Sequence, residues 1–166
     1  MIVTRLRLVY LTAVLVAVHN LEEALTFQYS LPLIEMRLPP ALRPWIEEGS
    51  RGAIYAALAI ATVIPWMCAF WWAHRPSNVL ATWLVLLVQT IVFVNAFWHL
   101  LVASVLLGGY APGLVTAVLV NMPFSIYLLL RVVRERWVSR ASLLALLPAA
   151  LLVHGAAPIA LFYFGR

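Results

Sequence analysis

The chain has no lysine and no aspartate, so its eleven cations are all arginine and its six acids are all glutamate. Charged residues make up only 10% of the 166 residues, whereas they approach about a quarter of an ordinary soluble domain. The mean hydropathy of +1.00 and the hydrophobic share of 65% exclude such a domain. With so few charges, the position of each one is informative.

Cysteine is nearly absent as well, because Cys68 is the only one, and an intrachain disulfide is therefore impossible. The net charge of +5 has no basic stripe or aromatic platform behind it, since the arginines are spread along the chain. These absences exclude a disulfide scaffold, and we expect no nucleic-acid partner. Contact with anionic lipid headgroups accounts for the arginines, so we expect membrane lipids around the protein.

Long apolar runs dominate what is present, and five of them reach the roughly 20 residues that a helix needs to cross the hydrocarbon layer. The runs lie at about Leu8–Phe27, Gly52–Trp72, Asn78–Leu107, Gly113–Leu130 and Ala141–Phe162. Ser77 and Ser139 could cap the helices that follow them. The sequence therefore predicts an all-α, multi-pass protein of the cell membrane, with residues 1–166 forming one bundle of five transmembrane helices.

The stretch Gln28–Arg51 between the first two runs differs from the rest, because it contains four of the ten prolines. A proline inside a helix removes a backbone hydrogen bond and clashes with the preceding turn. Gln28–Arg51 therefore cannot be one continuous helix, and we interpret it as an interfacial or re-entrant connection between the first two transmembrane helices.

The arginines also indicate the orientation in the membrane. If the N-terminus is cytoplasmic, seven arginines lie on the cytoplasmic side and four on the opposite side. This division follows the positive-inside rule. We therefore expect a cytoplasmic N-terminus and, after five crossings, a C-terminus on the outer side.

Ionisable residues inside the first apolar run, at His19, Glu22 and Glu23, are the strongest sign of function. A single acid at the centre of a membrane helix costs about 2.5–3.5 kcal/mol, so two adjacent acids need partners or water. Residues three and four positions apart share a helix face, which puts both carboxyl groups beside the imidazole. We therefore predict that these three residues are catalytic.

The third apolar run repeats the pattern, because Asn95 and His99 are four positions apart and join the predicted catalytic set. Counted from the outer ends of the runs, one polar residue in each of four runs lies about eight residues deep, or roughly 12 Å. These residues are His19, His99, Asn121 and His154. A shared depth predicts one polar pocket. The predicted substrate-binding residues are Phe97, Trp98, Tyr110, Asn121 and His154.

Three short motifs follow one another along the first four runs. They are His19-x-x-Glu22-Glu23, Asn95-x-x-x-His99 and Tyr110-x-Pro112-Gly113. In this order they resemble the signature motifs of the HXXEE family of small integral-membrane proteins. The resemblance implies a membrane protein suspected of being an enzyme, with no particular reaction. The third motif also lies in a glycine-rich turn that would fix the third helix against the fourth.

The sequence favours an enzyme that performs acid–base chemistry on a lipophilic small molecule entering from the membrane. A carboxyl group in a dry site can stay protonated and donate, while a second carboxyl or a histidine receives the proton. Aromatic neighbours such as Phe97 and Trp98 could stabilise a developing cation. This chemistry suits isomerisation, cyclisation or epoxide opening, and we expect it to use no cofactor. By analogy, the arrangement is similar to that of the five-helix sterol isomerases.

Three alternatives stay open at this point. A metal such as zinc or iron could bind in the same region and support hydrolysis or oxidation. Its ligands would be drawn from His19, Glu22, Glu23, His99 and His154. A glutamate-activated water, as in the glutamate-type intramembrane proteases, would need no metal. A proton-coupled carrier would also contain paired Glu and His, although five spans without an internal repeat would then call for a homo-oligomer.

Overall fold

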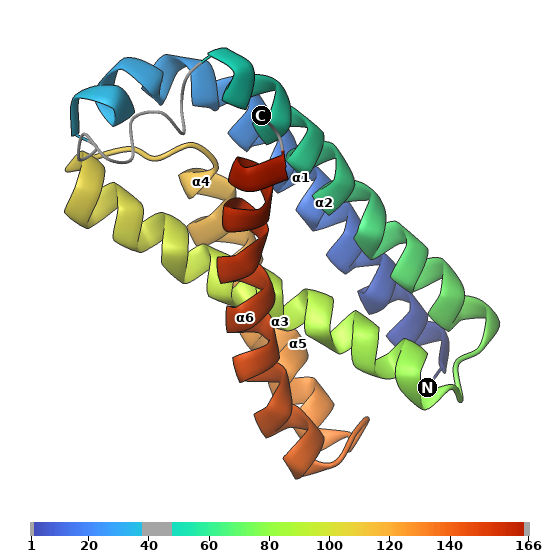
Figure 1. The fold of residues 1–166 in the computed structure, drawn as a ribbon. Helices are drawn as coiled ribbons and strands as arrows, with labels where there is room; N and C mark the ends of the chain where they lie inside the picture. The colour runs from blue at the N-terminus through green and yellow to red at the C-terminus, as the bar shows by residue number, and fades with distance from the viewer. Residues whose placement is uncertain (1, 38–47, 165–166) are drawn as a thin grey trace.

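The computed structural model describes residues 2–37 and 48–164, and this part of the chain is helical without any strand. Each of the five predicted runs forms one continuous helical rod (Figure 1). Two of the rods contain short π-helical segments, which are named η2 and η3. The elements are α1 (Ile2–Arg37), α2 (Glu48–His74), α3 (Val79–Leu101) continued by η2 (Val102–Leu107), α4 (Leu114–Thr116) continued by η3 (Ala117–Asn121) and α5 (Met122–Arg134), and α6 (Arg140–Phe164). The prediction of an all-α bundle is confirmed.

Length and composition agree with a membrane location. Within the described residues, four helical segments are long and apolar enough to cross a bilayer. They are Thr4–Arg37, Gly52–His74, Val79–Leu107 and Leu114–Arg134. The fifth rod, α6, has 25 residues, of which Arg140–Ala156 form its described apolar part. The chain is therefore a membrane protein whose helices expose apolar side chains over most of their length.

The connection between the first two rods is shorter than the sequence predicts. α1 continues past Phe27 to Arg37 with Pro32 inside it, and α2 already begins at Glu48. The predicted boundary at Phe27 is wrong because one proline removes one backbone hydrogen bond, and a long membrane helix tolerates that loss. The other prolines of the predicted connection lie at positions 39, 40 and 44, outside the described residues.

The helix starts show how the turns are set. Asn78 caps α3 by accepting the amide N–H of Ala81 at 2.9 Å, so the cap is one residue later than the predicted Ser77. Asparagine is a strong N-cap because its carbonyl oxygen reaches the free amides of the first turn. Ser139 accepts the amide of Ser142 at 3.1 Å, as predicted for the start of α6.

Two groups of helices make up the bundle. α1 packs along α2, whereas α3 packs on both α5 and α6 (Figure 1). The two groups are joined by a buried polar chain in which Thr12 donates to Gln89 at 2.8 Å and Gln89 donates to Ser125 at 2.6 Å. These bonds connect α1, α3 and α5, and interhelical hydrogen bonds of this kind fix the register of membrane helices.

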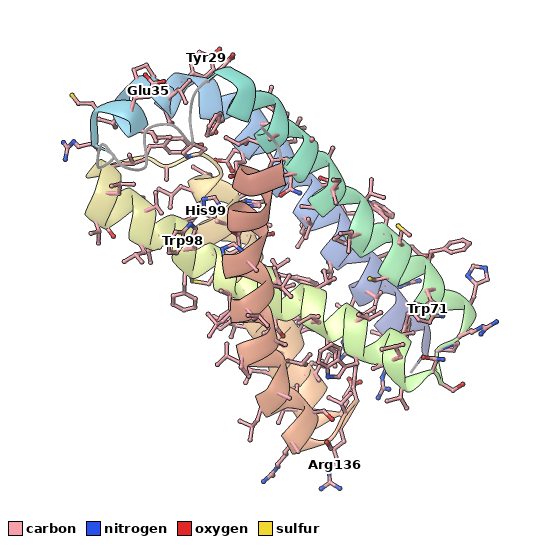
Figure 2. All side chains as sticks on the ribbon, viewed as in Figure 1. Tyr29, Glu35, Trp71, Trp98, His99 and Arg136 are labelled. Atoms are coloured by element: carbon pink, nitrogen blue, oxygen red, sulfur yellow. The ribbon has the colours of Figure 1, made fainter. Side chains whose placement is uncertain are left out.

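One end of the bundle carries a charged network. Glu135 pairs with Arg5 of α1 at 3.2 Å and with Arg131, and it accepts the indole N–H of Trp137 at 2.8 Å. Hydrogen bonds from Trp137 and Arg131 hold the pKa of Glu135 at about 2. Trp71 and Arg136 lie at this same end (Figure 2), where α1 begins (Figure 1). Arginines counted for the positive-inside rule thus gather on one side, and the cytoplasmic N-terminus stays a prediction.

Candidate functional site

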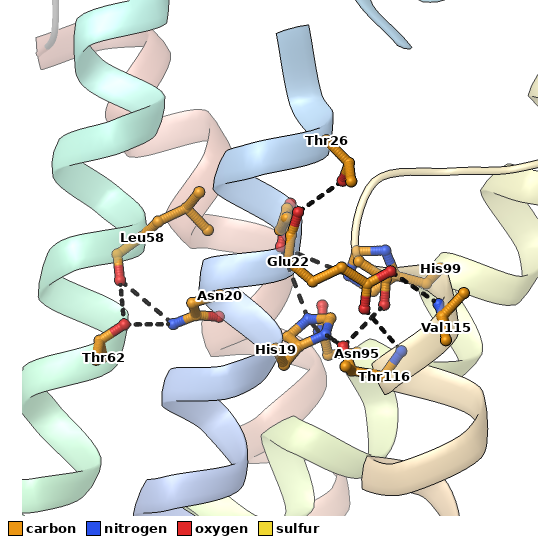
Figure 3. Close-up of polar contacts among 12 residues, drawn as sticks. His19, Asn20, Glu22, Thr26, Leu58, Thr62, Asn95, His99, Val115 and Thr116 are labelled. Carbon is orange, nitrogen blue, oxygen red and sulfur yellow. Dashed lines mark hydrogen bonds and ion pairs between the residues drawn. The ribbon is translucent and has the colours of Figure 1, made fainter. Parts of the chain in front are cut away.

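The predicted catalytic residues of α1 and α3 meet in the opposite half of the bundle, below the turn that joins η2 to α4. The imidazoles of His19 and His99 approach edge to face, with ring centroids 4.8 Å apart. Both are buried, at 2% and 7% exposure. Two residues 80 positions apart in the sequence therefore form one site (Figure 3).

Glu23 faces both imidazoles. Its Oε2 atom lies 3.7 Å from Nε2 of His19 and 3.7 Å from Nε2 of His99. These separations are too long for hydrogen bonds, which fall near 2.7–3.2 Å. One carboxylate oxygen and two ring nitrogens thus surround a small common space. We call His19, Glu23 and His99 the central triad.

The partners of His19 fix its tautomer. The amide nitrogen of Asn95 can only donate, so Nε2 of His19, which lies 2.9 Å away, accepts this hydrogen bond with its lone pair. The proton then resides on Nδ1, which donates to the hydroxyl of Thr116 at 3.0 Å. His19 is therefore a neutral acceptor whose lone pair is on the side of Glu23 and Asn95.

Glu22 is adjacent to Glu23, but its carboxylate has different hydrogen-bond partners. Its carboxylate accepts the backbone N–H of Val115 at 3.2 Å, the backbone N–H of Thr116 at 2.8 Å and the hydroxyl of Tyr110 at 2.7 Å. The first amides of a helix have no partner within the helix, and a negative charge at this end is favourable. Glu22 thus caps the start of α4 from another helix.

Tyr110 supports this cap from outside the predicted spans. Burial raises the pKa of its phenol, and the hydrogen bond to Glu22 acts in the same direction. The phenol therefore stays protonated and donates to the carboxylate. The sequence predicts a substrate-binding role for Tyr110, and that role stays a prediction beside the contact that the structure adds.

Gly113 brings the turn against the triad. Its φ is +74°, and a Cβ atom there would lie 2.8 Å from Cε1 of His19, 3.2 Å from Cε1 of His99 and 3.3 Å from Cβ of Glu23. Any side chain at this position would overlap an imidazole ring. The Tyr110-x-Pro112-Gly113 motif therefore covers the triad directly at Gly113. The sequence predicts only a turn that fixes the third helix against the fourth.

Two of the predicted substrate-binding residues lie on the outer surface of α3. Phe97 and Trp98 are half exposed, because a helix turns them away from the face that carries Asn95 and His99. Phe97 packs on Phe93, and the Trp98 ring meets the His154 ring edge to face at 6.3 Å (Figure 2 labels Trp98 and His99). Their predicted roles stay predictions.

Asn121 lies deeper, at the end of η3. It is 1% exposed, and its amide nitrogen and oxygen are the buried side-chain atoms of the described residues that have no hydrogen-bond partner. Unpartnered buried amides are costly, so a polar contact from a bound molecule would stabilise this side chain. The substrate-binding role of Asn121 also stays a prediction.

Several contacts of the site go beyond what the sequence predicts. Thr116 and Val115 lie in an apolar run whose sequence gives no sign of a contact with α1. Asn20, the residue after His19, donates to the hydroxyl of Thr62 at 2.8 Å and to the carbonyl of Leu58 at 3.3 Å, which ties α1 to α2 beside the site. A hydroxyl residue three positions after a motif glycine is the only signal that could have indicated Thr116.

The central triad also has the composition of a metal site. The ligand atoms of His19, Glu23 and His99 all lie within 4.8 Å of one another, and they form the one such group found among the described residues. Glu22 and His154, which the sequence also offers as ligands, are not part of it. The arrangement could thus move protons, hold a divalent ion, or do both.

Comparisons with known proteins agree with the motifs. The family model described as "Protein of unknown function with HXXEE motif" matches residues 10–128. The chain is 25% identical over 115 residues to the uncharacterized protein YrkK of Bacillus subtilis (strain 168), covering 65% of this chain and 63% of YrkK. The match thus spans less than two thirds of that relative. No solved structure matches.

Proposed function

This chain belongs to the HXXEE family, and from the buried cluster that its three motifs form we propose that it is an integral-membrane enzyme. It acts on a lipid-soluble small molecule by proton transfer at the central triad. Isomerisation, cyclisation and epoxide opening are the reactions that this chemistry suits, because each needs a proton delivered to or removed from an otherwise apolar molecule.

The observation that supports this proposal most directly is the difference between the two adjacent glutamates. Three hydrogen bonds engage the carboxylate of Glu22 in a structural role. Glu23 instead faces two imidazoles across 3.7 Å, a distance that leaves its proton-exchanging oxygen available. Placing such a group inside a membrane is costly, and residues of this kind within spans are usually functional.

The roles within the triad follow from the hydrogen bonds. Nε2 of His19 carries a lone pair and can accept a proton once the Asn95 amide turns away from it, since Nδ1 is protonated and bonded to Thr116. The Glu23 carboxyl can donate one when it is protonated, and His99 can return it. Asn95 orients the His19 ring by its bond to Nε2. One member therefore donates while another receives, as in other paired acid–base sites.

The substrate class follows from the surroundings of the site. The helices that carry the triad expose large apolar side chains outward, such as Leu21, Leu25 and Leu101. A molecule that dissolves in the hydrocarbon layer reaches this depth without crossing an aqueous barrier. We therefore expect an apolar substrate with one double bond, epoxide or similar reactive group.

Solvent deuterium can test the proposal while the substrate is still unidentified. The purified protein in lipid nanodiscs is incubated in D₂O with a total lipid extract, and the lipids are compared by mass spectrometry. We expect at least one lipid-soluble compound to gain deuterium or to be converted. The Glu23→Gln variant should lower the rate by about 100-fold or more, the range for losing a general acid or base.

The matched control is His74→Ala, which removes an exposed histidine at the end of α2 that lies away from the site. It should leave the rate unchanged. An equal rate in Glu23→Gln and the unchanged protein would contradict the proposed function. Transport of an unaltered compound into proteoliposomes, with no conversion, would favour the carrier alternative instead.

A further inference from the structure

We propose that the central triad binds one divalent transition-metal ion, with zinc or ferrous iron as the class of ion that its ligands suit. Two imidazoles and one carboxylate are the ligand set of many catalytic sites of both metals. The catalytic meaning of such an ion rests on the proposed function, whereas its binding can be measured without any substrate. A bound ion would replace the cofactor-free site that the sequence favours.

The donor atoms are arranged around a common point. Both histidines present Nε2 to the same oxygen of Glu23, at 3.7 Å each. An ion bound at about 2.0–2.2 Å in a tetrahedral site holds its ligand atoms about 3.4 Å apart. Shifts of a few tenths of an ångström would therefore bring these two distances to those of a metal site. The two ring nitrogens, which lie within 4.8 Å of each other, would also have to move closer together.

One group behind the triad is of the kind that metal-bound histidines usually have. Nδ1 of His19 donates to Thr116, which holds the ring with Nε2 directed inward. A hydrogen bond of this kind fixes the tautomer and raises the basicity of the coordinating nitrogen. The backbone at Gly113 lies against both rings, since a Cβ atom there would be 2.8 Å from Cε1 of His19 and 3.2 Å from Cε1 of His99. The third motif and the residues after it thus hold both imidazoles in place.

Asn95 would change its hydrogen bond when an ion binds. Its amide nitrogen now donates to Nε2 of His19 at 2.9 Å. Rotation of the amide by half a turn would exchange its nitrogen for its oxygen, and the two are interchangeable in shape. An ion would therefore displace this hydrogen bond, and the Asn95 oxygen would then face a water molecule bound to the ion.

Charge supports an ion at this place. Glu22 and Glu23 are adjacent within a membrane helix, and the ion pairs of Glu23 in the described part of the chain are with the two imidazoles alone. A divalent cation beside them would balance two carboxylates. Uncompensated charge at this depth is expensive, so the ion would stabilise the site as well as act in it.

The ligand count leaves room for chemistry. Three protein ligands leave at least one coordination position open, as in catalytic zinc and iron sites. A water molecule in that position would have a lowered pKa and could supply the proton or the nucleophile. Glu23 would then be a ligand, and the exchangeable proton would belong to the water.

Metal analysis of the purified protein tests the proposal. The chain is purified without chelators, incubated separately with Zn²⁺ or Fe²⁺, dialysed, and analysed by elemental mass spectrometry. We expect about one ion per chain, and about tenfold or more loss of affinity in His19→Ala, Glu23→Gln and His99→Ala. His74→Ala is the matched control and should retain the ion. Cobalt substitution should give visible absorption bands of a low-coordinate site.

Substoichiometric binding by the unchanged protein would overturn the proposal, as would equal metal content in the triad variants. Each variant is checked by circular dichroism and thermal unfolding, so that loss of the ion is separated from loss of the fold. Conversion of lipid that persists in fully chelated protein would contradict a catalytic ion while leaving proton transfer by the triad intact. The two proposals can therefore fail separately.

Discussion

The two halves of the bundle differ in how closely their polar groups are paired. In the half where α1 begins, Thr12, Gln89 and Ser125 bond to one another at 2.6–2.8 Å, and Glu135 has three partners. In the other half, the central triad holds its ionisable atoms 3.7 Å apart. The closely bonded groups connect helices. The more widely spaced atoms of the central triad leave room for a proton in transfer or a bound ion.

The same contrast occurs between neighbouring residues. Glu22 is engaged by two backbone amides and a phenol, so it belongs to the structural group although it lies in the site. Glu23, one position later, belongs to the other. A carboxylate inside a membrane helix therefore need not be catalytic, and its hydrogen-bond partners decide which role it has.

The largest effect is expected for Gly113→Ala. A Cβ atom would overlap His19 at 2.8 Å, and φ of +74° adds about 1–2 kcal/mol of backbone strain. We expect the free energy of unfolding to fall by about 3 kcal/mol and activity or ion binding to be lost. Tryptophan fluorescence during thermal unfolding in detergent would measure the first, and the deuterium and metal assays would measure the second.

Two glycines of the same turn separate the causes. Gly108 has φ of +63°, and a Cβ atom placed there would meet nothing within 4 Å, so Gly108→Ala should show the strain alone. Gly109 has open space and no positive φ, so Gly109→Ala should be nearly neutral. Equal losses of stability at Gly108, Gly109 and Gly113 would mean that close packing of Gly113 on the imidazoles is unimportant for stability.

Glu22→Gln should lower stability by about 1.5 kcal/mol, because a charged acceptor of three hydrogen bonds becomes a neutral one. Glu23→Gln should leave the stability of metal-free protein nearly unchanged while it lowers turnover by about 100-fold or more. Thermal unfolding of both variants, beside their activities, gives the comparison. A larger loss of stability in Glu23→Gln than in Glu22→Gln would reverse the roles assigned to the two residues.

Gln89→Leu tests the buried polar chain that connects α1, α3 and α5. The variant removes the link between Thr12 and Ser125, and interhelical hydrogen bonds in membranes are worth about 0.6–1.7 kcal/mol. We expect a loss of about 1 kcal/mol in unfolding free energy with the reaction rate retained. A loss of activity without a loss of stability would show that this chain of polar residues also serves the site.

The smallest effect is a pH dependence at the charged end. The pKa of Glu135 is about 2, below its ordinary value of 4.5. A lowered pKa contributes stability above pH 4.5, and that contribution is lost as the pH falls toward 2. Glu135→Gln should therefore unfold with a weaker pH dependence between pH 4.5 and 2 than the unchanged protein. An unaltered slope would mean that the contacts of Glu135 are unimportant in solution.

Much of the fold can be predicted from the sequence, because the lengths of the apolar runs define the helices. The rare polar residues within these runs indicate the position of the site. His19 and Glu23 are one helical turn apart, so their proximity is a local property. The division between Glu22 and Glu23 is not local, since it depends on amides 93 and 94 positions later. The continuation of α1 through Pro32 is not readable in this way, because a single proline does not decide where a membrane helix ends.

The contact between Glu22 and Thr116 spans 94 positions of the chain, and this has a consequence for biogenesis. α1 is synthesised and enters the membrane with two carboxyl groups long before the amides that cap one of them exist. The site can therefore be completed only when the fourth rod has been inserted. Until that time the two carboxyl groups of the nascent first helix lack the partners that the folded chain provides, and their cost within the membrane is not compensated.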